Sequence, residues 1–362
     1  MRIRSLLLAF GVLLGALLAP TPASATPPVR YAFAYVDAPA APAWVNLSAA
    51  HRWPVGVQGM KIGPGRYQIK FPGVGYGSRG VAHVTAVDYG ARNCQLVGWT
   101  QTSTGDEIVT TQCWQVAGGV ISPADTRHTV VWTVGSGVLA AGQPGHAYVH
   151  YRPGVGIVDQ YNSLGLVNGV AGANPYTVTF PAVGDPAGAV LAGDVQVTAI
   201  DPLYHRRCKL GSFTHSGTNI TAVVLCFDGA NGLPPTEFAV SYHRRQSVYG
   251  AFAPPTRMGY LWCLPGGGTV PGQTNWNSVV GVGGNSCAAL APGFYQSSWP
   301  QIGPPQTNAH VTAISTQPNF CNLKLLWSAN AAFDVTGHQG CWTSPGGVAV
   351  NEPHLMTFTS RV

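Results

Sequence analysis

Apolar and polar residues alternate in short stretches along the chain, with turn-forming residues between them. The alternation is clearest at Val223, Leu225 and Phe227, which would share one face of a strand. No stretch after residue 25 has a convincing helical period. The pattern therefore predicts short strands joined by turns. In the first part of the chain, such β-branched or aromatic stretches lie at 31–36, 58–62, 67–71, 82–88, 95–99, 108–114 and 129–133.

The order of these stretches recurs three times. Segment 67–75, which reads Tyr-Gln-Ile-Lys-Phe-Pro-Gly-Val-Gly, has counterparts at 176–184 and 295–303. A Thr-Ala pair follows each segment and is always preceded by valine, and its threonines, Thr85, Thr198 and Thr312, lie 113 and 114 residues apart. Two cysteines and two aromatic residues come next in every copy. This spacing is that of a whole domain and is too long for a solenoid repeat.

We therefore predict an all-β protein of three tandem antiparallel β-sandwich domains, immunoglobulin-like or jelly-roll in topology. Segments rich in Gly, Pro or Ala at 139–145 and 246–256 are the expected linkers. The domains are then 27–138, 139–250 and 251–362, called the first, second and third repeats below. We expect the same strand order in each repeat and no sheet that crosses their boundaries.

The first 25 residues have the pattern of a secretory signal peptide. Two arginines precede an apolar run at 6–19, and Ala-Ser-Ala at 23–25 supplies small residues for cleavage. The run is too short for a settled membrane span, and the C-terminus has no apolar tail. The sequence thus predicts a secreted, extracellular protein with no stable membrane anchor after signal cleavage.

Composition narrows the class of protein further. Hydrophobic residues make up 46% of the chain and charged residues only 9%, which excludes an intrinsically disordered protein. The formal net charge is +6, but basic residues gather only at 206–207 and 243–245. Nucleic-acid binding proteins usually have a basic stripe, so we predict no nucleic-acid partner.

Eight cysteines in a secreted chain indicate disulfides, and spacing alone allows 105 pairings. The repeats select one of them, with one equivalent bridge in each repeat and an extra bridge in the third. A metal site is the alternative, but the chain has no Cys-x-x-Cys and no histidine that recurs beside the cysteines. The predicted bridges are Cys94–Cys113, Cys208–Cys226, Cys321–Cys341 and Cys263–Cys287.

Catalytic motifs are absent. The chain has no nucleophile elbow, zinc-protease motif, phosphate loop or calcium loop, and 284–288 lacks the last glycine of an elbow. Asp106 and Glu107 are the only adjacent acidic pair, and we interpret them as an exposed hairpin tip. A Ser-His-Asp triad remains open, because its members can lie anywhere in a sequence. We predict no catalytic residue, no cofactor and no metal ligand.

The aromatic residues after the cysteines recur in every repeat, so we interpret them as core. This group comprises Trp99, Phe213 and Trp327 after the first cysteine, and Trp114, Phe227 and Trp342 after the second. Trp53 has no counterpart in the other repeats. It is the single candidate for a ligand-binding aromatic, with a loop plug as the alternative.

The motif order Tyr-x-Val-x-Phe-Pro, Val-Thr-Ala, cysteine, aromatic and cysteine-aromatic resembles tandem-repeat secreted proteins of actinobacterial type. The resemblance covers roughly residues 30–362, and the third repeat departs from it by adding Cys263 and Cys287. It implies export and a repeated architecture. It lends no functional residues, because such proteins mostly have no assigned activity.

Two functions follow from these observations. The first is a non-enzymatic binding or structural protein whose partner is a cell-surface glycan or protein, because three similar domains share no polar constellation. The second is a hydrolase acting on an extracellular polymer, with its site in the divergent third repeat. A cleft that joins a histidine, an acid and a serine would favour the hydrolase.

Overall fold

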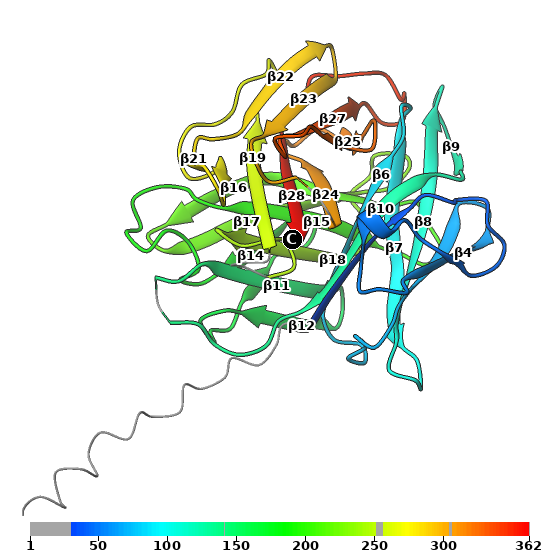
Figure 1. The fold of residues 1–362 in the computed structure, drawn as a ribbon, viewed down its shortest axis with the longest axis horizontal. Helices are drawn as coiled ribbons and strands as arrows, with labels where there is room; N and C mark the ends of the chain where they lie inside the picture. The colour runs from blue at the N-terminus through cyan, green and yellow to red at the C-terminus, as the bar shows by residue number, and fades with distance from the viewer. Residues whose placement is uncertain (1–29, 141, 251–255, 304–305, 362) are drawn as a thin grey trace, which may run out of the picture.

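The computed structural model describes residues 30–140, 142–250, 256–303 and 306–361 (Figure 1). The predicted signal peptide at 1–25 lies outside these residues. The described chain consists of strands, turns and one short 3-10 helix, η1 (Ala49–His51), so the all-β class is confirmed. No helix in this part of the chain is long and apolar enough to cross a membrane.

The first repeat contributes two groups of paired strands. One group has the order β3–β1–β10–β6, and the other has the order β7–β8–β5–β4–β2 with β9 also paired to β8. The bounds are β1 (Arg30–Val36), β2 (Val45–Asn46), β3 (Arg52–Trp53), β4 (Gln58–Gly63), β5 (Arg66–Phe71), β6 (Val81–Val87), β7 (Arg92–Gln101), β8 (Glu107–Ala117), β9 (Val120–Pro123) and β10 (Arg127–Val134).

The second repeat has the corresponding groups β12–β11–β18–β15 and β13–β14–β17–β16. The bounds are β11 (Gly145–Arg152), β12 (Gly156–Asn162), β13 (Gly169–Ala171), β14 (Tyr176–Phe180), β15 (Asp194–Ile200), β16 (Arg207–Ser216), β17 (Asn219–Phe227) and β18 (Glu237–Arg244).

The third repeat has the groups β21–β20–β19–β28–β24 and β22–β23–β27–β25, with β26 also paired to β27. The bounds are β19 (Thr256–Cys263), β20 (Trp276–Asn277), β21 (Gly281–Val282), β22 (Ser286–Ala291), β23 (Phe294–Trp299), β24 (Gln306–Ala313), β25 (Phe320–Leu323), β26 (Ser328–Ala329), β27 (Val335–Trp342) and β28 (His354–Arg361).

The strand order is the same in the three repeats. In each, the long first strand pairs with the last strand, and the last strand pairs with the strand that carries the Thr-Ala pair: β6, β15 or β24. These three strands are buried along nearly their whole length, unlike β5, where burial alternates as expected for a strand with one covered face. They are therefore covered on both faces.

Two of the four sheets cross the repeat boundaries, so the expectation of separate sheets is wrong. The second and first repeats share a ten-stranded sheet through a parallel contact of Ile200 with Leu96. The first and third share a nine-stranded sheet through Val87 and Leu323. An unpaired strand edge is a liability, and each contact covers the end of such an edge with the neighbouring repeat.

A third contact of the same kind closes the cycle. Ile314 forms a parallel bridge with Leu210, which joins the third repeat to the second. At each junction, the amide N–H three residues beyond the threonine donates to the carbonyl two residues beyond the first cysteine. These bonds are Asp201 N to Leu96 O at 2.9 Å, Ser315 N to Leu210 O at 2.9 Å and Asp88 N to Leu323 O at 2.8 Å.

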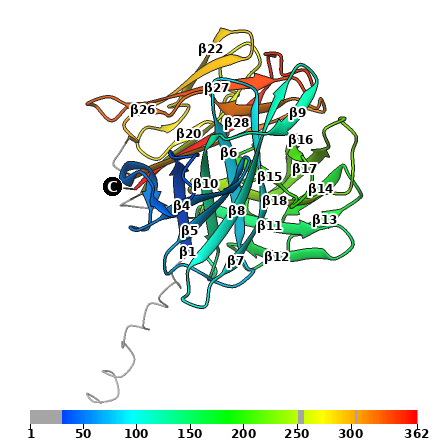
Figure 2. The ribbon, with the colours of Figure 1, turned by 90° about the vertical axis from the view of Figure 1, so that its right-hand side faces the viewer.

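The hydrophobic core follows the same cyclic pattern. Three large clusters form, each made mainly of buried residues from one repeat. In Figure 1 the blue-to-cyan, green and yellow-to-red parts surround the middle, and Figure 2 shows β6, β10, β15 and β18 side by side in the interior. Each cluster also takes residues from the next repeat: Tyr148, Ile200 and Ala239 join the first, Ile314 and Leu355 the second, and Tyr35 and Val87 the third.

Candidate functional site

The strands β6, β15 and β24 meet along a line that we call the central axis. Two positions before the threonine of each Thr-Ala pair lies His83, Gln196 or His310. The side chain of this residue contacts the corresponding threonine of the next repeat. All six side chains are buried. The contacts are His83 Nδ1–Thr198 Oγ1 at 3.1 Å, Thr312 Oγ1–Gln196 Oε1 at 2.8 Å and Thr85 Oγ1–His310 Nδ1 at 3.2 Å.

Burial determines the protonation of the axial histidines. It lowers the pKa of His83 to about 3 and holds the pKa of His310 well below its usual value, since a buried imidazolium loses its hydration. Both rings are therefore neutral near pH 7. They serve as hydrogen-bonding groups between repeats rather than as acids or bases.

The described residues contain two pairs of histidine and carboxylate. His243 Nε2 lies 3.4 Å from Asp194 Oδ2, but both side chains are fully buried, and burial raises the pKa of Asp194 to about 7. His150 Nε2 lies 2.6 Å from Glu237, which also binds Arg152 at 2.7 Å. Neither pair forms part of a cleft with a serine, and neither lies in the third repeat.

One end of the central axis opens into a cavity, called the axial cavity below. It has a volume of about 40 Å³ and is lined by equivalent residues from all three repeats. The threonines of the axis lie in its wall. The residues two positions before the first cysteines are Arg92, Arg206 and Asn319, and those one position before are Asn93, Arg207 and Phe320.

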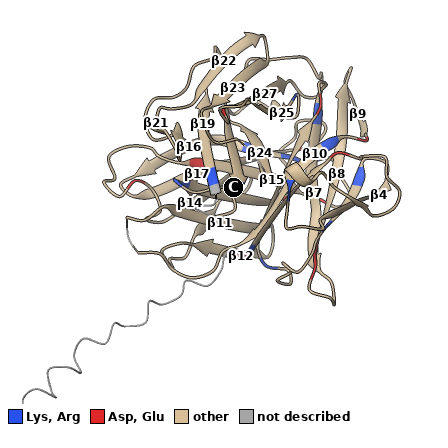
Figure 3. Cartoon of the chain, in the orientation of Figure 1, with Lys and Arg blue, Asp and Glu red and all other residues tan. Residues whose placement is uncertain are grey.

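The wall of the axial cavity carries cations and no carboxylate. Arg92 lies 3.8 Å from Asp88, and Arg206 lies 3.3 Å from Asp201, so each of these arginines has an acidic partner from the adjoining loop. Arg207 also lines the cavity but forms no ion pair with any described carboxylate. Figure 3 shows the charged residues scattered over strands and loops, so this group is a local feature rather than part of a continuous stripe in that view.

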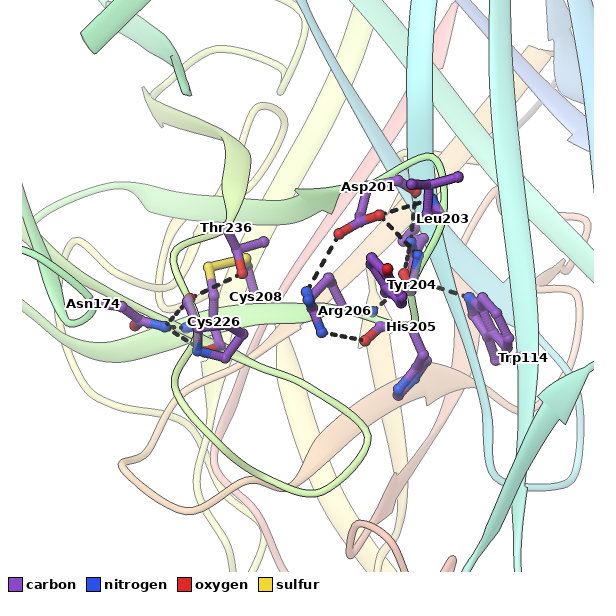
Figure 4. Close-up of polar contacts among 12 residues, drawn as sticks. Trp114, Asn174, Asp201, Leu203, Tyr204, His205, Arg206, Cys208, Cys226 and Thr236 are labelled. Atoms are coloured by element: carbon purple, nitrogen blue, oxygen red, sulfur yellow. Dashed lines mark hydrogen bonds and ion pairs between the residues drawn. A yellow bond between two sulfur atoms is a disulfide. The ribbon is translucent and has the colours of Figure 1, made fainter. Parts of the chain in front are cut away.

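The residue after each first cysteine joins its repeat to the loop beyond the axial strand of the next. Figure 4 shows Asp201, Tyr204, Arg206 and Trp114 at the junction of the first and second repeats. In the first repeat the joining residue is Gln95, whose Nε2 donates to Asp201 O at 2.8 Å and Tyr204 O at 2.7 Å. Its Oε1 accepts from Trp114 Nε1 at 3.0 Å and from Arg206 N at 2.8 Å. The amide is thus fully hydrogen-bonded, and it holds Arg206 at the mouth of the axial cavity.

Asn322 has the same role between the third and first repeats. Its Nδ2 donates to Asp88 O at 3.2 Å and Gly90 O at 2.9 Å. Its Oδ1 accepts from Trp342 Nε1 at 3.0 Å. A tryptophan N–H and an amide oxygen therefore form the same pair at two of the three junctions.

The junction between the second and third repeats uses an ion instead. Lys209 Nζ donates to Ser315 Oγ and Gln317 O, both at 2.9 Å, and lies 2.5 Å from Glu352. Burial lowers the pKa of Lys209 to about 8, although the Glu352 charge acts in the opposite direction. An ammonium cannot accept a hydrogen bond, and at this junction the tryptophan is replaced by Phe227, which has no donor.

The loops held by these contacts carry exposed side chains beside the axial cavity. Tyr89 and Tyr204 are each 60% exposed, and Leu203 is 72% exposed. The Arg206 guanidinium lies over the Tyr204 ring, 5.3 Å from its centroid. Exposed aromatic faces next to a cationic cavity form a surface suited to binding.

The core assignment of the recurring tryptophans needs correction. Trp327 is buried, but Trp99, Trp114 and Trp342 are only half-buried. They lie at the junctions, where neighbouring repeats cover one part of each ring. The aromatic residues after the first cysteines contact equivalent residues of the next repeat: Trp99 packs on His150 at 4.7 Å, Phe213 on Trp262 at 6.4 Å and Trp327 on Tyr35 at 6.3 Å between ring centroids.

Trp53, the predicted ligand-binding aromatic, lies away from the axial cavity. It is half-buried and packs against a small cluster that includes Phe33 and Tyr249. The Arg361 guanidinium lies over its ring, 3.3 Å from the centroid. One face of the indole is therefore occupied by the chain itself.

Asp106 and Glu107, interpreted from the sequence as an exposed hairpin tip, differ from each other in burial. The tip of the β7–β8 hairpin includes Asp106, as expected, but Glu107 is fully buried. Its Oε2 accepts from Tyr76 N at 3.3 Å, and burial raises the pKa of Glu107 to about 7. The two carboxyl groups therefore do not form an exposed pair.

All four predicted disulfides are present: Cys94–Cys113, Cys208–Cys226, Cys263–Cys287 and Cys321–Cys341. Three groups of two cysteines and a histidine lie close enough to hold a metal, around His128 and twice around His354. Their cysteines are the disulfide-bonded ones, so these groups offer no thiolate ligand.

Sequence reasoning missed the residues that build the axial cavity and the junctions. Arg206 and Arg207 stood out only as a pair of basic residues. A usable signal was present in the residues next to the cysteines, where Gln95 and Asn322 occur with tryptophans and Lys209 occurs with phenylalanine. Comparisons with protein-family models, with curated proteins and with solved structures found no match.

Proposed function

We propose that this chain is a secreted, non-enzymatic binding protein made of three tandem β-sandwich modules, 27–138, 139–250 and 251–362. The observation that carries the proposal is the closed cycle of equivalent junctions. It gathers three corresponding loops around the axial cavity, and two of them present the exposed rings of Tyr89 and Tyr204 near the half-buried Arg92 and Arg206. The four disulfides suit an extracellular site of action.

The modular arrangement is supported by the repeated strand order and by three cores, each drawn mainly from one repeat. An interface that maps one patch of a unit onto a different patch of the next closes into a ring when the rotation allows it. In an experimental structure, the three ranges should superpose with matched strands. A strand order that differs between them would contradict the modules.

The partner we favour is a cell-surface glycan. The exposed rings of Tyr89 and Tyr204 offer flat apolar faces for sugar rings, with polar groups at the side. A protein partner is the other outcome of the test. The hydrolase alternative has less support, because neither acid of the described third repeat, Asp334 or Glu352, has its carboxylate hydrogen-bonded to a histidine.

The test is binding of labelled mature protein, residues 26–362, to a glycan array and to insoluble extracellular polymers. We expect binding without release of soluble fragments. A Tyr89→Ala/Tyr204→Ala variant should lose most of this binding. It removes two aromatic faces on which sugar rings would stack, and it leaves the fold intact because both side chains are exposed. The matched control is Phe333→Ala, an exposed aromatic at the β26–β27 turn. Polymer hydrolysis, or equal binding by the double variant, would contradict the proposal.

A further inference from the structure

We propose that the axial cavity binds a phosphate or sulfate group, with Arg207 as its buried contact. The inference rests on the proposed function, because it names the chemical group that the binding face recognises. It depends on three features: a buried arginine without a counter-ion, equivalent donors from three repeats, and a cavity of suitable size.

Arg207 is a buried cation with an incomplete set of partners. It is only 3% exposed. Its Nη2 donates to Asn231 Oδ1 at 2.7 Å and to Pro318 O at 3.5 Å, and its Nη1 lies 3.4 Å from His205 Nδ1, whereas its Nε has no hydrogen-bond partner. Asp228 is the carboxylate that acts on it through space, but it is too distant to form an ion pair. Arginine is rarely buried unless it is paired, so this guanidinium lacks an anion.

Electrostatics agrees with the geometry. Burial lowers the pKa of Arg207 to about 10, which leaves it charged at neutral pH. His205 is buried beside it, and the charges of Arg207 and Arg206 add to burial in holding the pKa of His205 well below its usual value. The cations of the cavity wall are therefore Arg92, Arg206, Arg207 and Lys209, and Arg207 is the one that has no ion pair with a described carboxylate. An oxyanion would offset its charge.

Donors approach the axial cavity from three directions. Arg92, Arg206 and Asn319 occupy equivalent positions around its mouth, one from each repeat. The Nε atoms of Arg92 and Arg206 make no hydrogen bond, although they lie 3.8 Å from Asp88 and 3.3 Å from Asp201, and Asn319 Nδ2 donates to Glu352 Oε2 at 2.9 Å. A tetrahedral oxyanion can direct three oxygens toward three donors, which a carboxylate with two oxygens cannot do. Arginine is also the side chain best suited to binding phosphate and sulfate oxygens.

The size of the cavity fits one such group. Its volume is about 40 Å³. We therefore assign to this space one small oxyanion rather than a sugar ring. A sugar that carries the anion would therefore lie outside, against the exposed loops that contain Tyr89 and Tyr204.

The test is titration calorimetry of the mature protein with inorganic phosphate and inorganic sulfate, at constant ionic strength in chloride. We expect saturable binding and a saturable rise in melting temperature. Arg207→Gln should weaken binding by about ten- to a hundredfold, because it removes hydrogen bonds to a charged group. It should melt in chloride no lower than the parent, since it removes an unpaired buried charge. Arg79→Gln, which alters an exposed arginine paired with Asp159, is the matched control.

A second variant and a second ligand make the result decisive. Arg92→Gln should also weaken phosphate binding, by a smaller factor, without touching the buried arginine. Glucose 6-phosphate distinguishes the sources of the group: binding of the ester assigns a phosphorylated glycan, and binding of the inorganic ion alone assigns the free ion. Equal affinity in the parent and Arg207→Gln, or no saturable binding, would overturn the inference. If glycan-array binding then persists, the proposed function stands without it.

Discussion

The second repeat differs from the first and third at each point where the repeats meet. The first and third have a tryptophan after the second cysteine, an amide after the first cysteine, and a histidine on the central axis. The second has phenylalanine, lysine and glutamine at these positions. The contacts explain why the first two changes occur together: a tryptophan N–H needs the amide oxygen, whereas Lys209 needs only acceptors and binds Glu352 in the third repeat.

This difference shows that one geometry accommodates two kinds of chemistry. Two junctions are held by neutral hydrogen bonds, and one is held by a buried ion pair. The two neutral junctions have no charged side chain in their central hydrogen bonds. The ionic junction is destabilised when either Lys209 or Glu352 loses its charge, because the other charge is then buried without a partner. The comparison gives four predictions about stability, each measurable on a protein of residues 26–362.

Acid should have the largest effect, acting through buried histidines. The folded pKa of His83 is about 3, and those of His128, His146 and His354 are about 4, all below the usual value of 6.5. A lowered folded pKa means that stability is present above pH 6.5 and is lost as the pH falls toward 4. At pH 5 each ring costs about 2 kcal/mol. Melting temperature should therefore be much lower at pH 5 than at pH 7.5.

Two buried acids act in the opposite direction. Glu107 and Asp194 have folded pKa values of about 7, so they favour the folded state as the pH falls through 7. The histidines outnumber them, which sets the net sign. Gln196 occupies in the second repeat the position of His83 and His310, so glutamine is compatible with this site. The variant His83→Gln/His310→Gln should therefore fold, and its melting temperature should depend less on pH. An unchanged difference between pH 7.5 and pH 5 would show that the axial histidines do not contribute.

Breaking the ionic junction should have the next largest effect. Lys209→Met leaves the Glu352 carboxylate buried without its cation, which costs about 3–5 kcal/mol in the free energy of unfolding. The double variant Lys209→Met/Glu352→Gln should recover part of this loss, because it removes the uncompensated charge. Thermal and denaturant unfolding measure both. A single variant as stable as the parent would mean that the pair is open to water.

The neutral junctions should respond more weakly. Gln95→Leu leaves two carbonyls of the 201–204 loop and the Trp114 N–H without their partner, at a cost of about 2–3 kcal/mol. Trp114→Phe removes the N–H donor and leaves the smaller ring that occurs naturally at Phe227, so it should cost about 1 kcal/mol, less than expected for a core tryptophan. Asn322→Leu is the matched variant at the junction between the third and first repeats. A loss for Trp114→Phe as large as that for Gln95→Leu would indicate that the ring, not the amide, holds the junction.

Trp53 should have the smallest effect. Trp53→Ala removes a half-buried ring and its contact with the Arg361 guanidinium, so we expect a loss of about 1 kcal/mol. Glycan binding should be unchanged, because this ring lies away from the axial cavity. Calorimetry and the glycan array measure the two effects. Loss of binding with unchanged melting would restore Trp53 as a ligand-binding residue.

Local features made the strands and bridges predictable. Alternation and turn residues marked β5, β6 and β8 closely, and the period of the repeats selected the four disulfides from 105 pairings. The burial of the tryptophans was harder to predict. Recurrence in every repeat is expected of a core residue, but it is equally expected of a residue at a junction that occurs three times.

The sequence by itself determined the all-β class, the threefold repetition and the cysteine pairs, because each depends on short-range pattern or on equivalence between copies. Only the tertiary structure decided that the repeats close into a cycle, that Gln95, Lys209 and Asn322 hold the junctions, and that Arg207 lies buried in an axial cavity. The junction contacts of these residues join positions 106 to 234 apart in the sequence. They depend on how complete surfaces fit together, and no local pattern encodes that fit.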